Sequence, residues 1–199
     1  MRAMPRPKRA PEGTASTRDR VLAVAIGLMQ ERGYNGFSFQ DVAKQVGISH
    51  VAVHHHFASK CALAVAAMSA YTVNFRALLD EIDAREPTPA QALHAYVELF
   101  AATLHDDRRI CLCGMLTAEY ATLPAEVQPE VRSFYDVNEQ WLAGHIRIAR
   151  RGVRSPSALA LARAFLAALE GAMMSARAFG DAGRLREAGA WLTGSIAGK

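Results

Sequence analysis

A tight glycine turn between two short amphipathic segments is the feature that most constrains the fold of this chain. Apolar side chains recur at helical spacing over residues 39–46, with Ser38 available as the N-cap and Gly47 as the stop. After the Gly-Ile-Ser turn, Ser49 can cap a second short helix that runs to His56. Two short helices joined in this way predict a helix-turn-helix.

The rest of the chain is also helical by its apolar periodicity. No strand-length alternation, internal repeat or βαβ rhythm is found in the sequence. The predicted fold class is therefore all-α, with a three-helix N-terminal helix-turn-helix domain followed by six further helices. The remaining predicted helices are Thr17–Arg32, a long helix from Ser59 that is broken at Arg85–Pro89, Pro89–His105, Cys113–Thr122, Pro124–Arg151, Pro156–Gly180 and Arg184–Ile196.

Composition restricts the cellular compartment that we expect for this chain. Its 51% hydrophobic content suffices for a core, and the apolar run 159–169 is broken by Arg163 and followed by Glu170. That run is well short of the ~18 apolar residues of a membrane span, and no apolar signal-peptide core follows the first residues. The three cysteines are odd in number, and Cys111 and Cys113 lie one residue apart, so a reducing compartment fits better than a disulfide framework. We expect a cytoplasmic protein without a membrane segment.

The net positive charge of the chain arises from its N-terminal segment. Residues 1–20 hold six cationic and two acidic side chains, which accounts for the whole net charge of +4. The Pro-rich basic segment 1–15 is expected to be a disordered arm that is attracted to a polyanion. The alternative is that it is only a solubilising tail.

Three consecutive histidines in the second short helix raise the question of a metal or catalytic site. His54, His55 and His56 point about 100° apart on a helix and cannot converge on one ion. His50 and His54 are four residues apart, but no nearby Cys, Asp or Glu completes a zinc site. A catalytic site would need a nucleophile with a base and an orienting group, or paired carboxylates, and none is supplied there. We therefore expect no metal, no cofactor and no enzymatic activity.

The segment FSFQDVAKQVGISHVAVHHHFASKCAL (37–63) resembles the TetR/AcrR family of one-component transcriptional repressors. The resemblance is specific over residues 16–63 and implies a DNA-binding domain there, preceded by the arm 1–15 and followed by a ligand-binding and dimerisation domain, 64–199. His54 replaces a tyrosine that usually contacts phosphate in this family, and Val51 replaces a small or polar residue. The segment CLCGMLTAEYATLP (111–124) resembles a Cys-x-x-Gly-x-Leu-x-x-Glu segment of a subset with electrophile- and acrylate-responsive members.

The DNA interpretation also follows from the helices themselves. A helix of the length of Ser49–His56 fits the major groove when the preceding helix crosses the backbone and a third supports both. His56 is expected to be half-buried under Phe57. Four apolar residues should face inward: Val46, Ile48, Val53 and Phe57. The candidate DNA-contacting residues are Ser38, Lys44, Ser49, His50, Val51, Ala52, His54, His55 and Lys60, the last at a helix N-terminus suited to phosphate.

A small-molecule sensor is expected between residues 71 and 150. Most aromatic residues at helical spacing are core residues. Cys111 and Cys113 are either reactive thiols activated by Arg108 and Arg109 or buried small hydrophobes. The candidate ligand-binding residues are Tyr71, Phe75, Tyr96, Phe100, Cys111, Cys113, Met115, Glu119, Tyr120, Phe134, Trp141 and His145, with Arg147 as a further polar group.

Residues 157–180 are small and apolar on nearly every side, as in a helix packed on its own domain and on a partner. The residues expected in this homodimer interface are Leu159, Phe165, Leu166, Leu169, Met173, Leu185, Ala188, Trp191 and Leu192. Together these features predict a dimeric repressor on a palindromic operator, released by a small molecule or an electrophile. Two alternatives remain: an enzyme using His145 or Glu119 as a base, and an architectural DNA-binding protein without a ligand.

Overall fold

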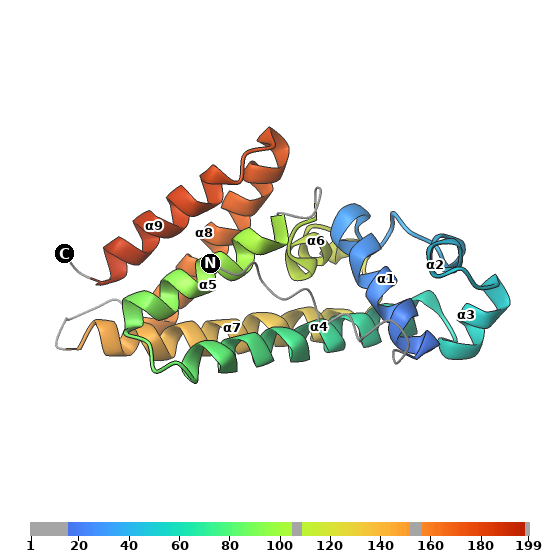
Figure 1. Ribbon diagram of the computed structural model, residues 1–199, viewed down its shortest axis with the longest axis horizontal. Coiled ribbons are helices and arrows are strands. Elements are labelled where there is room, and N and C mark those ends of the chain that lie inside the picture. Colours follow the sequence, from blue (N-terminus) through green and yellow to red (C-terminus); the bar gives the residue numbers. More distant parts are fainter. Residues whose placement is uncertain (1–15, 105–108, 152–156, 198–199) are drawn as a thin grey trace. The chain divides into compact units, whose positions relative to one another are not determined.

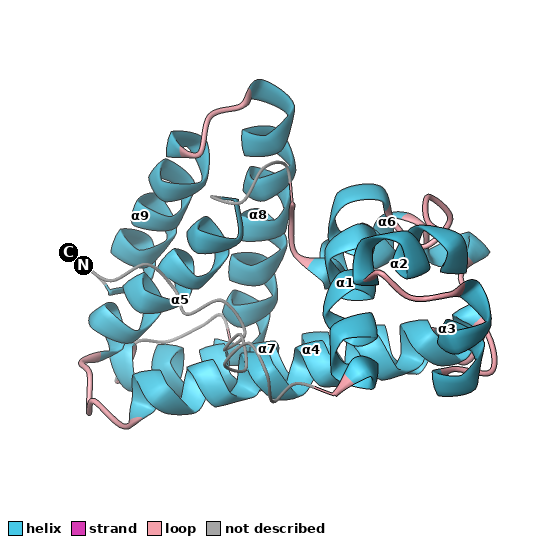
Figure 2. Ribbon diagram, turned by 45° about the vertical axis from the view of Figure 1, so that its right-hand side comes forward, coloured by secondary structure: helices cyan, strands magenta, loops and turns pink. Residues whose placement is uncertain are grey.

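The computed structural model describes residues 16–104, 109–151 and 157–197, and over these ranges it contains helices and no strand (Figures 1 and 2). The predicted all-α fold class, with three helices followed by six, is confirmed. The elements are α1 Thr17–Arg32, α2 Phe39–Val46, α3 His50–His56, α4 Lys60–Asp83, α5 Pro89–Leu104, α6 Leu112–Ala118, the 3-10 helix η1 Tyr120–Thr122, α7 Gln128–Ala149, α8 Ala158–Phe179 and α9 Gly183–Ala197.

The chain forms two compact units that do not follow a single cut in the sequence. The first unit contains the chain up to Asn74 together with Leu112–Ser133, and the second contains Phe75–Cys111 and Phe134 onward. Helices α4 and α7 therefore each contribute residues to both units. The functional division at residues 15 and 63 stays a prediction, and the arm 1–15 lies outside the described residues.

Side-chain caps set the helix boundaries in the first unit. Ser16 and Asp19 form a capping box at α1, and Ser38 and Asp41 form one at α2. Gly47 ends α2 in the left-handed conformation, with φ of 77°, which a residue with a Cβ rarely adopts. The hydroxyl of Ser49 accepts the N–H of Ala52 at 3.1 Å and begins α3. The predicted helix-turn-helix is confirmed with these caps.

For two of the predicted helices, one boundary is wrong. The helix expected over 113–122 breaks at Glu119, which has a non-helical backbone and separates α6 from η1. The helix expected from Pro124 begins only at Gln128, because residues 124–127 form a turn in which the Pro124 carbonyl accepts the N–H of Val127 at 3.0 Å. The apolar periodicity continues through both points, but a long-range contact of Glu119 interrupts the first helix and a local turn delays the second.

The core of the first unit holds α3 in place. Val53 is fully buried, and Val46 and Phe57 are nearly so, as predicted, whereas Ile48 is only half-buried. The guanidinium of Arg20 donates to the carbonyl of Val46, and that of Arg18 lies 4.9 Å from the ring centre of Phe57.

The second unit is built around α5, α8 and α9, with α8 packed on both α9 and α5. Tyr96 lies at its centre, where its hydroxyl donates to Oδ1 of the buried Asn138 at 2.7 Å. Close packing of α9 on α5 requires Gly189, since a Cβ there would lie 2.3 Å from the side chain of Val97.

This packing corrects part of the predicted dimer interface. Of the nine residues named for it, Phe165, Leu166, Leu169, Met173 and Leu185 are buried inside the second unit. A side chain that is buried in the core of its own subunit cannot also contact a second subunit. Trp191, by contrast, is 71% exposed, and the exposed side of α8 consists of other residues.

Two valines of α3 provide a matched test of this packing. Val53 is fully buried and Val51 is 63% exposed, so Val53→Ala removes core contacts and Val51→Ala removes none. We expect Val53→Ala to lower the free energy of unfolding by about 1–3 kcal/mol and Val51→Ala to change it by less than about 0.5 kcal/mol. Urea denaturation followed by circular dichroism measures both, and equal midpoints for the two variants would contradict the orientation of α3.

Candidate functional site

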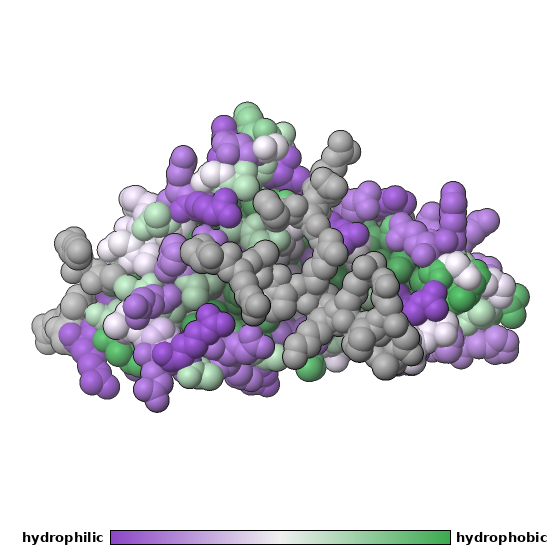
Figure 3. Space-filling view, viewed as in Figure 1, coloured by the Kyte–Doolittle hydropathy of each residue, from purple (hydrophilic) through white to green (hydrophobic). Residues whose placement is uncertain are grey.

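Helix α3 presents a continuous outward face from the helix-turn-helix. His50, Val51, His54 and His55 are exposed and Ala52 is half-exposed. Figure 3 shows hydrophobic residues among hydrophilic ones over this end of the first unit, in keeping with the exposure of Val51. The face is thus apolar at one point and imidazole-rich around it, which suits base edges and methyl groups as well as phosphates.

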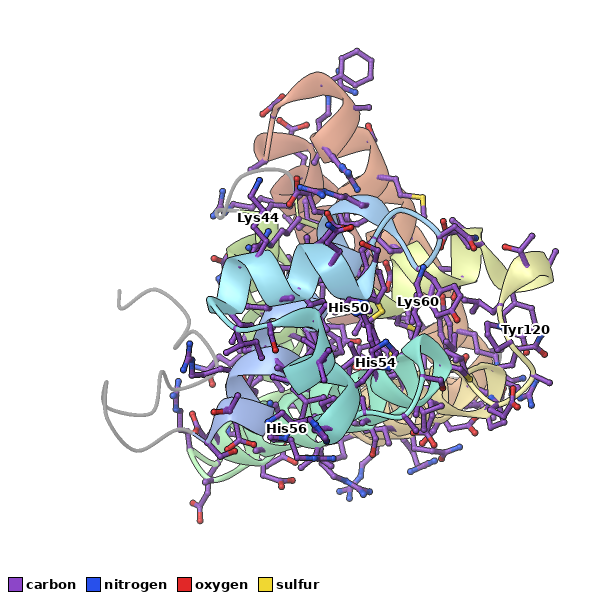
Figure 4. The ribbon with its side chains drawn as sticks, turned by 90° about the vertical axis from the view of Figure 1, so that its right-hand side faces the viewer. Lys44, His50, His54, His56, Lys60 and Tyr120 are labelled. Atoms are coloured by element: carbon purple, nitrogen blue, oxygen red, sulfur yellow. The ribbon has the colours of Figure 1, made fainter. Side chains whose placement is uncertain are left out.

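Two histidines on this face, His50 and His54, pack against each other and against α2. The ring centres of His50 and His54 are 4.7 Å apart, and His54 lies 4.6 Å from the ring of Phe39 in α2. Figure 4 shows His50 and His54 together near α2, while His56 lies at the other end of α3. The expected half-burial of His56 is wrong: its side chain is exposed, because Phe57 turns into the core without covering it.

Lys60 begins α4 and is held by two aromatic rings. Its ammonium lies 4.6 Å from the ring centre of Tyr34 and 4.7 Å from that of Phe37. Partial burial lowers the pKa of this lysine, while Glu119 and Asp41 oppose the shift. The contacts fix the ammonium near the start of α4. Lys44 is fully on the surface of α2, and the hydroxyls of Ser38 and Ser49 are engaged in capping.

Glu119 ties α6 to the end of α1. Its Oε2 accepts the backbone N–H of Tyr34 at 2.5 Å and of Asn35 at 3.3 Å. Gly33 has φ of 76°, and a Cβ on it would lie only 2.6 Å from Oε1 of Glu119. The carboxylate therefore occupies a cradle made by backbone donors and a glycine, and its predicted role in ligand binding finds no support in these contacts.

Other predicted sensor residues of the first unit have structural contacts. The Cys113 thiol donates to the carbonyl of Val131 at 3.6 Å within the core, which supports the interpretation as a small buried residue. The hydroxyl of Tyr120 accepts from the Arg132 guanidinium. Tyr71 and Met115 are half-buried.

The second unit brings five of the predicted aromatic residues together. Phe75 lies 5.1 Å from Phe134, and Tyr96 lies 5.2 Å from Phe100. Trp141 stacks on Tyr96 at 5.5 Å with an interplanar angle of 20°. These rings are the apolar wall that a hydrophobic ligand in this unit would meet.

Trp141 and His145 also border an open cleft of about 580 Å³ at the end of α4. Oδ2 of Asp83 accepts the indole N–H of Trp141 at 3.0 Å, and Oδ1 lies 2.9 Å from Nε2 of His145. Arg147 lines the same cleft. Asp83 thus fixes two predicted ligand residues and was missed, because it lies 58 residues before Trp141 in the chain.

Cys111 and its neighbour on α8 are the remaining features of the second unit. Cys111 is buried, and its backbone N–H donates to Sδ of Met173 at 3.0 Å. Glu170, also on α8, is buried with it. A helical-wheel reading of α8 could have found Glu170, since it falls among Leu166, Leu169 and Met173 on the buried face. Arg109 is half-buried, and Arg108 lies outside the described residues.

The Glu119 contact can be tested by removing its carboxylate. Glu119→Ala leaves the N–H groups of Tyr34 and Asn35 without their acceptor, so we expect the free energy of unfolding to fall by about 1–3 kcal/mol. Glu81→Ala, at an exposed position of α4, is the control and should change it by less than about 0.5 kcal/mol. Chemical denaturation of both variants decides the matter; indistinguishable midpoints would show that the carboxylate does not stabilise the unit.

Comparison with known proteins agrees with this geometry in both parts of the chain. Residues 21–67 match the profile of bacterial regulatory proteins of the TetR family, and residues 89–190 match the C-terminal domain of LmrA/YxaF-like transcriptional regulators. Among characterised proteins, the HTH-type transcriptional regulator CymR of Pseudomonas putida is 30% identical over 144 residues, which cover 69% of this chain and 70% of CymR.

Solved structures extend the likeness over almost the whole chain. A TetR transcriptional regulator from Legionella pneumophila superimposes with a TM-score of 0.85 at 30% identity, covering 90% of this chain and 97% of that one. A TetR-family regulator from Agrobacterium tumefaciens gives a TM-score of 0.84 at 32% identity, covering 89% and 95%. With its helix-turn-helix and its C-terminal helices both matched, this chain belongs to the TetR family of transcriptional regulators.

Proposed function

We propose that this protein is a homodimeric repressor that places α3 of each subunit in the major groove of a palindromic operator and leaves the DNA when an effector binds the second unit. The outward face of α3, fixed by the buried Val53 and left uncovered at Val51, His54 and His55, is the observation that carries the proposal. The protein acts on DNA in the cytoplasm. The enzyme and architectural alternatives find no support among the relatives.

Contacts to DNA divide into two kinds. Residues 50–52 and 54–55 meet the base edges and the flanking phosphates, while Lys60 and Lys44 meet phosphates. The rings of Tyr34 and Phe37 position the Lys60 ammonium and so support its role as a fixed phosphate contact. The basic arm 1–15 adds phosphate contacts without setting sequence preference.

The exposed side of α8 is the proposed dimer interface, together with Trp191 of α9. This side is mainly apolar and carries small residues that let a second helix approach closely, with Arg163 at its edge. Its exposed apolar members are Ala160, Ala164, Ala167, Ala168, Gly171, Met174 and Ala178. By length and composition alone, α4 and α8 also pass as membrane spans. A partner helix explains the apolar side of α8 better, because the opposite side of α8 fills a globular core.

Release of DNA is proposed to run through α6. Cys111 is the last residue of its segment in the second unit, and the next residue, Leu112, begins the segment that belongs to the first. Glu119, directly after α6, accepts the N–H groups of Tyr34 and Asn35, which follow α1. An effector that displaces Cys111 therefore pulls on the helix-turn-helix through α6.

A substitution that adds a negative charge to α3 tests the proposed DNA interface. Val51→Glu places a carboxylate against the phosphates, and because it falls in the first turn of α3 it favours the helix rather than disrupting it. We expect operator affinity to fall by about 100-fold or more, equivalent to about 2.7 kcal/mol. Fluorescence anisotropy with labelled DNA from upstream of the protein's own gene measures the affinity.

Val73→Glu is the matched control, since Val73 is 64% exposed on α4 in the same unit. It makes the same substitution at the same exposure and should change the affinity by less than about threefold. Equal losses for both variants would mean that net charge, and not α3, governs binding.

A charge on α8 tests the dimer interface. Ala168→Glu sets two like charges against each other in a desolvated contact, so we expect the dimer to dissociate at micromolar concentration and operator affinity to fall with it. Ala77→Glu, at an exposed position of α4, should remain dimeric. Analytical ultracentrifugation gives the mass of each variant, and an intact dimer in Ala168→Glu would move the interface to another surface.

Footprinting of the purified protein on DNA upstream of its own gene tests the function as a whole. Two protected half-sites about 34 Å apart, or a multiple of the helical turn, are expected. Absence of any protected site there and in a random-sequence selection would refute a repressor function.

A further inference from the structure

Glu170 is an anomaly in the core of the second unit. It is only 6% exposed, and neither of its carboxyl oxygens reaches solvent or has a hydrogen-bond partner among the described residues. Buried polar groups normally have such partners, because an unpaired carboxylate in an apolar medium is strongly destabilising. The packing of α8 therefore leaves one strong acceptor without a donor.

The surroundings of Glu170 are apolar and sulfur-rich. It lies on the same side of α8 as the buried Leu166 and Met173, and Met173 accepts the backbone N–H of Cys111. The Cys111 thiol acts on the carboxyl as a weak donor and lowers its pKa, without completing a hydrogen bond to it. We call Glu170, Met173 and Cys111 the Glu170 cluster.

No described cation compensates the carboxyl. Arg186 of α9 pairs with Glu98 of α5 at 3.4 Å, and Arg163 of α8 pairs with Glu139 of α7 at 2.9 Å. His94 of α5 is exposed. Burial raises the pKa of the Glu170 carboxyl to about 7, and the Cys111 thiol acts in the opposite direction. Near neutral pH the acid thus lies close to the point at which an added cation would ionise it.

We propose that the Glu170 cluster is the polar end of the effector site and that it takes a lipophilic amine, whose ammonium is bound by the Glu170 carboxylate. This inference rests on the proposed function and adds the chemical class of its effector. An ammonium supplies both the donors and the positive charge that the carboxyl lacks. The apolar and sulfur-containing side chains of Leu166 and Met173 suit an apolar body attached to it. An anionic compound would instead place a second negative charge beside a buried acid.

Paired compounds that differ only in the head group test the amine. Phenethylamine, tryptamine and naphthylmethylamine are each compared with the alcohol of the same skeleton, by calorimetry and by release of labelled operator DNA. At least one amine is expected to bind the wild-type dimer at least about tenfold more tightly than its alcohol and to release the DNA. E170Q should lose this preference, and E187Q, an exposed position of α9, should keep it.

The wild-type protein alone provides a second readout that needs no variant to fold. A bound ammonium requires the carboxylate, so at pH 6, below the pKa of about 7, a proton must leave on binding. Amine affinity should therefore be roughly tenfold weaker at pH 6 than at pH 8, with proton release at the lower pH. E170Q should show no such slope.

The pH dependence of the melting temperature of E170Q, compared with that of the wild type, provides a third test. Because the folded pKa lies above the ordinary value, the protonated acid is favoured in the fold, and that contribution is lost as the pH rises through about 7. The melting temperature of E170Q should therefore exceed that of the wild type by more at pH 8 than at pH 5.

Several results would overturn the inference. These are an amine series that does not bind, alcohols or phenylpropionic acid that bind as tightly as the amines, an unchanged preference in E170Q, and a release of DNA that only N-ethylmaleimide produces. In each of these cases the wild-type dimer would still bind its operator. Loss of operator binding in the absence of any compound would refute the proposed function instead.

Discussion

Two backbone N–H groups that follow α1, those of Tyr34 and Asn35, are satisfied by the carboxylate of Glu119, 85 and 84 residues away in the chain. The first unit depends on this contact, because it joins the helix-turn-helix to α6 and η1. It also explains two backbone features at once. A Cβ at Gly33 would clash with this carboxylate, and α6 ends at Ala118, so that the non-helical backbone of Glu119 directs the carboxylate toward α1.

The elements that the sequence predicts well are those with local causes. The ends of α1 and α2 follow from Ser16 and Ser38 as caps and from glycines at the stops, all within a few residues of each other. The late start of α7 follows from the local turn at 124–127, but the break at Glu119 depends on partners far along the chain. The same holds for the candidate ligand residues. The aromatic cluster around Tyr96 was predicted by type, but Asp83, which fixes Trp141 and His145, has no local signal.

Residue type alone also did not predict the environment of the charged and imidazole side chains. His54 and His56 are both exposed, but they point about 200° apart on α3, so His54 lies against Phe39 of α2 and His56 points away from it. Lys60 was expected at a helix N-terminus, but the two rings beneath its ammonium come from the loop after α1. Lys60 of the proposed DNA-binding surface is thus positioned by the same loop that Glu119 holds.

The sequence of helix α8 has three distinct features: an inner side, an outer side and one buried acid. Its inner side fills the core, its outer side is small and apolar, and Glu170 interrupts the inner side with an acid that stability alone would replace by leucine or glutamine. Residues that oppose stability are commonly kept for function. Because the outer side of α8 is the proposed contact with the second subunit, the proposed ligand of Glu170 would act on the helix that is also proposed to set the spacing between subunits. In a symmetric dimer the two copies of α8 must move together, so an effector at this position can change the separation of both recognition helices in one step.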